Sequence, residues 1–172
     1  MLNKKSKPKN RPTLSAPLTG PAPSSSLHLT SFHPSKPLYA VATTAIGQNV
    51  IRIFDTDRPV AGAQEVRCEV RLKRGEEVSC LAWTGYDGKK RKRVQSSAGE
   101  LVCGVTSGQI YIIEQASGEI VRTLEGHTAG VSSWSVGEDR GWSCGGDGKI
   151  KGWDPRTGTC LVYVDFLSLA DI

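Results

Sequence analysis

The stretch from Gly126 to Asp154 constrains the fold of this chain more than any other. It begins with Gly-His, continues with the strand-like run VSSWSV and, after a short gap, ends in GWSCGGDGKIKGWD. Asp147 lies in the turn sequence DGK, six residues before Trp153, and Ser143 lies four residues before Asp147. Short β-forming runs that are separated by glycine turns predict strands joined by tight turns.

This stretch resembles one complete unit of the WD-repeat proteins, whose units are the four-stranded blades of a β-propeller. The resemblance implies a buried chain of hydrogen bonds that starts at the Trp153 indole and passes through the Ser143 hydroxyl. It continues through the His127 imidazole and ends at the Asp147 carboxylate. These four groups can satisfy one another in series, and leaving one of them buried without a partner costs more than the roughly 1 kcal/mol that each link contributes. We therefore interpret His127 as a structural residue and not as a catalytic one.

Two earlier segments repeat the strand pattern without the full set of polar groups. The runs LYAVATT and NVIRIFD end on Phe54-Asp55, where Trp-Asp is expected. The runs EVSCLAW, LVCGVTS and QIYIIEQ place Ile113-Glu114 at the same point. Neither Phe54 nor Ile113 offers an indole N–H, so we expect no such hydrogen-bonded chain in these two units.

The spacing of the three units supports a common register. Phe54 and Ile113 are 59 residues apart, whereas Ile113 and Trp153 are 40 apart. Blades of this kind repeat at roughly 40–45 residues, and the excess in the first spacing matches a polar insertion at 84–99. The sequence therefore predicts an all-β fold: a partial WD-repeat β-propeller of three four-stranded antiparallel blades. Their expected bounds are 27–74, 75–125 and 126–168, with a loop at 58–64.

Residues 1–26 have a different composition from the rest of the chain. They contain mostly lysine, proline and serine, without apolar periodicity. Such a segment cannot bury enough surface to become ordered, so we expect a disordered tail. Its basic residues are compatible with RNA contact or nuclear targeting, whereas the prolines oppose the amphipathic helix of a mitochondrial presequence.

The net charge of +5 does not describe the body of the chain. Of 22 basic residues, the first eleven positions hold five and residues 89–93 hold five more, which leaves 12 basic residues against 17 acidic ones. Positive charge is therefore confined to two short segments. This distribution is unlike a nucleic-acid-binding fold with a basic face.

The second basic segment is the most specific functional signal. Its five consecutive cations are Lys89, Lys90, Arg91, Lys92 and Arg93. Such a run suits the acidic grooves of a nuclear import receptor, and it also suits phosphate contact with release of counterions. A solvated loop whose charge serves only solubility is the remaining alternative.

The five cysteines, Cys68, Cys80, Cys103, Cys144 and Cys160, show no C-x-x-C pair. Four of them lie in apolar strand-like runs, which favours reduced thiols in the core. The sequence contains no secretory signal and no apolar run of membrane-spanning length. We therefore expect an intracellular, soluble protein with no membrane association.

The residue patterns do not favour an enzyme. No serine or histidine has a nucleophile-elbow context, no glycine-rich phosphate loop occurs, and no metal-ligand spacing is present. We expect no catalytic residues, no metal, no cofactor and no small-molecule substrate. Trp83, Trp134 and Trp142 are interpreted as packing aromatics, and His28 and His33 as surface or turn histidines.

Three blades raise a closure problem, because propellers close with about four to eight. End blades would expose apolar faces of the kind that recruit partners or cause aggregation. We expect the chain to be part of a longer protein. Completion of the ring by another chain and an open stack of three blades are the alternatives.

A closer resemblance rests on three features in order. They are LYAVATT…IRIFDT, then CLAW followed directly by a basic insertion, and then ELVCGVTSGQIYIIEQASGEIVRTLEGHTAGVSSW. This order is similar to the nucleolar UtpA-type WD-repeat subunits of the small-subunit processome, over roughly residues 27–160. Its most specific part is CLAW-insertion-GxxxGxI, since the GH…WD portion is common to all WD-repeat proteins.

The resemblance implies a non-catalytic scaffold in ribosome biogenesis and pre-rRNA processing, located in the nucleus and in particular in the nucleolus. Its implied partners are other proteins of a large assembly, with pre-rRNA as a further candidate through the basic tail and loop. The alternative function is a WD-repeat adaptor in another complex, such as a ubiquitin ligase or a chromatin complex.

Overall fold

The computed structural model describes residues 26–45, 48–60, 63–84, 99–136, 140–154 and 157–166. Within these ranges every regular element is a β-strand, and twelve strands form three four-stranded antiparallel sheets. The predicted fold class is therefore confirmed. The described residues contain no helix that is long and apolar enough to cross a membrane.

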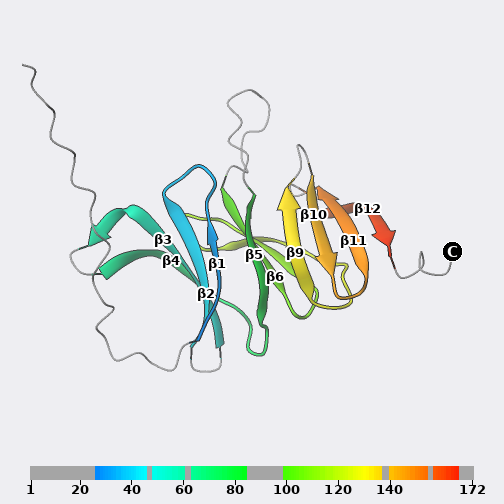
Figure 1. Ribbon diagram of the computed structural model, residues 1–172, viewed down its shortest axis with the longest axis horizontal. Coiled ribbons are helices and arrows are strands. Elements are labelled where there is room, and N and C mark those ends of the chain that lie inside the picture. The colour runs from blue at the N-terminus through cyan, green and yellow to red at the C-terminus, as the bar shows by residue number, and fades with distance from the viewer. Residues whose placement is uncertain are drawn as a thin grey trace, which may run out of the picture.

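Each sheet is built from strands that are consecutive in the chain (Figure 1). The first sheet contains β1 (Ser26–Phe32), β2 (Leu38–Ala45), β3 (Gln48–Val60) and β4 (Ala63–Arg71). The second contains β5 (Val78–Thr84), β6 (Glu100–Val105), β7 (Ile110–Ile113) and β8 (Ile120–Leu124). The third contains β9 (Val131–Val136), β10 (Gly141–Gly145), β11 (Lys149–Asp154) and β12 (Thr159–Asp165). Strand order follows sequence order, as expected for meanders closed by short turns.

One expected loop is largely strand. The sequence predicts a loop over 58–64, but β3 continues to Val60 and β4 begins at Ala63, with Val60 paired to Ala63. Backbone N–H and C=O groups form this ladder, so it does not require alternating side chains. The pairing also includes a register shift between Phe54 and Pro59. This shift interrupts the alternation of side chains along the strand, so the hairpin is not recognisable from a two-residue periodicity in the sequence.

The three sheets stand side by side in chain order, with the second sheet in the middle (Figure 1). Every residue of β6 and of β7 is buried, because the middle sheet is covered on both faces. One core lies between the first and second sheets and includes Ile51, Ile53 and Leu101. A second core lies between the second and third sheets and includes Ile112 and Trp153.

Hydrogen bonds also join neighbouring sheets. The Trp83 indole donates to the carbonyl of Ser31 at 3.2 Å, and the Ser79 hydroxyl donates to the carbonyl of Val131 at 2.6 Å. Burial of the apolar faces supplies about 25 cal/mol per Å² and is the main stabilising term. The side chain to backbone bonds add directional constraints that fix how each sheet sits on the next.

Candidate functional site

The third sheet gathers four polar side chains that lie far apart in the sequence. His127 lies in the segment between β8 and β9, and Ser143 lies in the middle of β10. Asp147 lies in the turn between β10 and β11, and Trp153 lies near the end of β11. The hairpin of β10 and β11 places Ser143 opposite Lys151 and Gly141 opposite Trp153, so the indole can reach back to the hydroxyl.

The four groups form a continuous hydrogen-bonded relay. The Trp153 Nε1–H donates to Ser143 Oγ at 2.7 Å, and Ser143 Oγ lies 2.7 Å from His127 Nε2. His127 Nδ1 lies 2.9 Å and 3.0 Å from the two carboxylate oxygens of Asp147. The structure thus brings together all four residues that the resemblance to WD-repeat units implies.

The chemistry of the partners determines the direction of each bond. Asp147 as a carboxylate only accepts, so His127 carries its proton on Nδ1. Trp153 only donates, so Ser143 Oγ accepts from it and uses its own O–H toward His127 Nε2. With a neutral imidazole every donor meets an acceptor, and each member of the relay is satisfied.

Asp147 also closes the turn in which it lies. Its carboxylate accepts from the backbone N–H of Thr128 at 3.1 Å and of Lys149 at 3.2 Å. Burial by itself raises the pKa of Asp147, but the hydrogen bond from His127 and the two backbone N–H groups outweigh it and hold the pKa below its usual value. The carboxylate therefore stays ionised and links the β10–β11 turn to the segment before β9.

A glycine next to the relay makes room for it. A Cβ at Gly145 would overlap His127 Nδ1 and would lie 2.6 Å from Asp147 Oδ1. Any side chain at this position would push the imidazole and the carboxylate apart. The sequence contains this signal in the run GGDG, but sequence reasoning alone did not identify Gly145 as part of the site.

The order Ser143, His127, Asp147 superficially matches the residue types of a hydrolytic triad. Ser143 is fully buried, however, and the side chain of His127 has no exposed surface. The serine oxygen already accepts from the Trp153 indole, which blocks the approach of a substrate carbonyl. The arrangement therefore has a structural role: it holds β10, β11 and the segment before β9 together in the third sheet.

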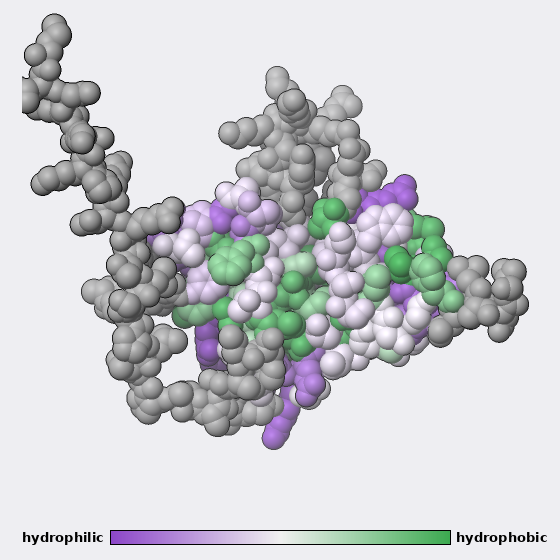
Figure 2. Space-filling model, viewed as in Figure 1, coloured by the Kyte–Doolittle hydropathy of each residue, from purple (hydrophilic) through white to green (hydrophobic). Residues whose placement is uncertain are grey.

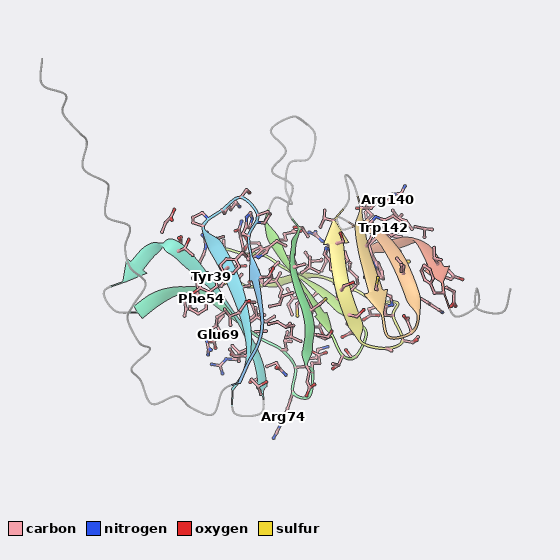
Figure 3. The ribbon with its side chains drawn as sticks, viewed as in Figure 1. Tyr39, Phe54, Glu69, Arg74, Arg140 and Trp142 are labelled. Carbon is pink, nitrogen blue, oxygen red and sulfur yellow. The ribbon has the colours of Figure 1, made fainter. Side chains whose placement is uncertain are left out.

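The first two sheets hold Phe54 and Ile113 at the place of Trp153, so they have no indole donor there. Ile113, at the place of Trp153, is fully buried, and Cys103 stands at the place of Ser143. In the first sheet Phe54 stacks on Tyr39 with ring centroids 4.9 Å apart (Figure 3). No donor–acceptor chain joins these positions among the described residues, because neither aliphatic nor phenyl groups offer hydrogen-bonding atoms.

The three tryptophans that we interpreted from the sequence as packing residues occupy two environments. Trp83 and Trp134 are buried between sheets, whereas Trp142 is 36% exposed on the outer face of the third sheet. The Trp134 ring lies over Gly141, which leaves no space for a Cβ there. Two of the three therefore pack between sheets, and the third faces outward.

His33 is a turn histidine, which is one of its two expected roles, but it does not lie on the surface. It lies in the turn after β1, but it is buried and its ring packs on Trp83 at 4.9 Å. His33 Nδ1 accepts from the backbone N–H groups of Ser35 and Lys36, which shapes the turn. Its burial depends on Trp83 of the neighbouring sheet, so the residues next to His33 in the sequence do not predict it. The side chain of His28 lies outside the described part of the structure.

Sequence reasoning also missed a buried ion pair. Arg122 of β8 donates from Nη2 to Glu100 Oε1 of β6, and both side chains are largely buried beside the third sheet. The two residues are not neighbours in sequence, and only the β6–β7–β8 ladder brings them to the same face of the second sheet. A buried pair of this kind adds little net stability, but breaking it leaves an uncompensated charge.

Several predicted features lie outside the described residues. They are the basic run Lys89, Lys90, Arg91, Lys92 and Arg93, and residues 1–25 of the tail. All five cysteines are described and are free thiols; Cys80 and Cys103 are buried, whereas Cys160 is exposed. Burial raises the pKa of the Cys103 thiol. Within the described part of the chain no cluster of metal-ligating side chains occurs.

Comparison with solved structures identifies the fold class of the chain. No protein-family model and no curated protein matches the chain. It is similar to the C-terminal WD40 domain of Sif2, with a TM-score of 0.61 and 17% identity over 79% of this chain and 36% of that chain. A chain in a crystal structure of the mitotic checkpoint complex matches with a TM-score of 0.60 and 21% identity, over 81% of this chain and 38% of that chain.

The chain thus spans little more than a third of the length of each of these solved chains. At this level of identity the similarity shows the fold, which is that of a WD40 β-propeller. The three sheets correspond to three blades of such a propeller.

Proposed function

We propose that this chain is a non-catalytic WD-repeat scaffold that binds other proteins in a large assembly. The observation that carries the proposal is the closed relay of the third sheet. Its Ser, His and Asp groups satisfy one another in the interior, whereas apolar side chains such as Phe32, Trp142 and Val162 are exposed at the surface. The buried polar groups thus stabilise the fold, and the exposed apolar side chains favour a role in binding other proteins.

The assembly that we propose is the small-subunit processome, in which the chain supports pre-rRNA processing in the nucleolus. The support is the sequence similarity to UtpA-type subunits, above all CLAW followed by a basic insertion. The insertion lies between β5 and β6 in the chain, so it interrupts no strand of the second sheet. An insertion at this point can bind a partner while the blade stays folded.

The basic run Lys89–Arg93 has two roles in this proposal. It binds a nuclear import receptor, and after import it contacts phosphates of pre-rRNA. Both roles use the positive charge of the run. The second role predicts that binding weakens as the salt concentration rises.

The test uses a fluorescent fusion of the full chain in cells. We expect the fusion to concentrate in the nucleolus and the variant with Lys89–Arg93 replaced by alanine to lose nuclear accumulation. We also expect pre-rRNA and processome proteins to co-purify with the unaltered chain. A fusion that stays cytoplasmic, or a replacement that changes nothing, contradicts the nuclear role.

The second candidate function is an adaptor in a different complex. The observation that favours it is that the two solved chains of similar fold belong to other proteins, one of them within the mitotic checkpoint complex. The same purification separates the two candidates. Recovery of a ubiquitin-ligase core or of chromatin proteins, without pre-rRNA, supports the adaptor role.

A further inference from the structure

The outer edge of the third sheet is formed by β12. Within the described part of the chain this strand pairs with β11 alone, so its other edge carries backbone N–H and C=O groups with no strand beside them. Every residue from Thr159 to Val164 is exposed, and hydrophobic side chains reach the surface over β12 at this end of the molecule (Figure 2). A free edge of this kind can pair with the backbone of another polypeptide segment.

The outer edges of the other two sheets have features that oppose such pairing. β4 contains Arg67, Glu69 and Arg71, and charged side chains along an edge discourage the approach of another strand. β8 has five residues and contains Arg122. In contrast, β12 has seven residues, and the run Thr159–Val164 is uncharged. Of these three outer edges, the edge of β12 is therefore the best suited to bind an extended segment.

A further sheet packed on the stack would leave the edge of β12 open. β4 and β8 also end their sheets, although another sheet follows each of them in the chain. Neighbouring sheets pack through their faces, where the two hydrophobic cores lie. The edge of β12 and the outer face of the third sheet are thus different surfaces, and what covers the face does not decide what binds the edge.

Two lysines of β11 gather at an exposed ring on this edge strand. Lys151 pairs with Tyr163, which is 61% exposed, and Lys149 lies two residues from Lys151 on the same side of β11. The Nζ atom of each lysine lies 5.7 Å from the centroid of the Tyr163 ring. Lys149 Nζ also lies 3.7 Å from Asp165 Oδ2, and Lys151 Nζ donates to the Gly126 carbonyl at 2.6 Å. Asp165 offsets one of the two positive charges and the carbonyl is neutral, so the surface around the ring is positive.

We propose that the edge of β12 binds an extended acidic segment of another protein, which adds a strand to the third sheet and directs its carboxylates toward Lys149 and Lys151. This inference rests on the proposed function as a protein-binding scaffold and names the class of segment that one of its surfaces takes. In an added strand, the residue opposite Tyr163 lies on the same side of the sheet as the two lysines, with its Cβ about 5 Å from that of Tyr163. Main-chain hydrogen bonds supply the affinity, and the side chains at alternate positions supply the specificity.

The charge and the geometry of the site favour this occupant. Residues 1–26 of the chain contain no acidic residue, so this segment does not supply the carboxylates. RNA offers phosphates to the lysines, but it has no peptide groups with which to continue the backbone ladder of β12. An acidic protein segment uses both the lysines and the strand edge.

Hydrogen exchange of the full chain with a model peptide tests the proposal. The probe is a fluorescein-labelled peptide of alternating valine and glutamate, about eight residues long, which is within the range of ordinary strands. We expect this peptide to bind and to slow the exchange of backbone amide protons in β12. A peptide with lysine in place of glutamate should not bind. The acidic peptide with N-methylated peptide bonds should not bind either, because its backbone cannot donate to β12.

Charge reversal locates the contact on the chain. Lys149→Glu should weaken the binding of the acidic peptide about tenfold and strengthen that of the lysine peptide by a similar factor. Lys73→Glu is the matched control, because Lys73 is an exposed lysine outside the third sheet. Circular dichroism checks that each variant keeps its strand content. Binding of the acidic peptide should also weaken as the salt concentration rises.

Three results would overturn the proposal. Slowed exchange in β4 or β8 instead of β12 would place the binding edge on another sheet. Binding that survives N-methylation would mean attraction between charges without an added strand. An RNA oligonucleotide that binds at Lys149 while the acidic peptide does not would assign the lysines to phosphate.

The outcome is separable from that of the proposed function. If the acidic peptide does not bind but the chain still recovers processome proteins from cells, this inference fails and the proposed function stands. If the peptide binds at β12 and no processome protein is recovered, the edge is a binding site and the nucleolar role fails.

Discussion

Gly145 faces His127 so closely that a side chain at this position would overlap the imidazole and would lie 2.6 Å from Asp147 Oδ1. Gly145→Ala should therefore break the bond between His127 and Asp147 and destabilise the chain by about 1–3 kcal/mol. Urea denaturation monitored by tryptophan fluorescence measures this change. The neighbouring Gly146→Ala is the control, because its Cβ would meet Ala129 at an ordinary 3.5 Å. Equal losses in both variants would show that flexibility of the turn, and not the relay, is responsible.

Removal of a relay member leaves its partners buried and unpaired. His127→Ala and Asp147→Ala should each lower the free energy of unfolding by about 1–3 kcal/mol. Ser107 lies six residues before Ile113, as Asp147 lies six residues before Trp153, but it is exposed. Ser107→Ala should change stability by less than about 0.5 kcal/mol. Equal sensitivity at both positions, measured in urea, would contradict a relay specific to the third sheet.

The lowered pKa of Asp147 predicts that the folded chain loses stability as the pH falls. Because its folded-state pKa is lowered from the usual 3.8, ionised Asp147 stabilises the fold above that value. This contribution is lost as the pH falls from 3.8 through the lower folded-state pKa. The stability difference between the unaltered chain and Asp147→Asn should therefore shrink on acidification. Denaturation curves at a series of acidic pH values measure it, and a difference that does not depend on pH would exclude this linkage.

Tyr111 provides a polar contact at the edge of the first core. Its hydroxyl donates to Glu76 Oε1 at 2.6 Å and lies 2.8 Å from Gln109 Oε1. Tyr111→Phe should cost about 0.5–1.5 kcal/mol, because the carboxylate loses a partner while the ring stays in place. Tyr163→Phe is the control, since Tyr163 is 61% exposed on β12. Thermal and urea unfolding of both variants check the difference.

Alkaline titration checks the same residue in a second way. Burial raises the pKa of Tyr111, and the hydrogen bond to Glu76 raises it further. A raised pKa in the folded state means stability that is present below the ordinary tyrosine pKa and is lost as the pH rises through the folded value. Tyr111 should therefore ionise only when the chain unfolds, which ultraviolet absorbance detects. Ionisation of Tyr111 in the folded chain would contradict its burial.

Much of the fold was predictable from local patterns. Runs such as LYAVATT and IYII combine β-branched residues with flanking turn residues, and strand propensity acts over a few residues only. The four residues of the relay came from the resemblance of 126–154 to a WD-repeat unit, and the short hairpin turn between β10 and β11 keeps Asp147 and Trp153 within reach of Ser143 and His127. The hairpin at the end of β3 could not be predicted, because a backbone ladder forms there without alternating side chains.

Local residue patterns predicted β-strands in three repeating units, and the resemblance of 126–154 to a WD-repeat unit marked the third as the unit with the complete set of polar groups. Which faces those units bury follows from how the sheets pack on one another. This packing places His33 against Trp83, joins Glu100 to Arg122, and leaves Phe32 exposed. The physical reason is that strand formation depends on residues close in the chain. Burial depends on which sheet packs against each face, and that partner lies tens of residues away.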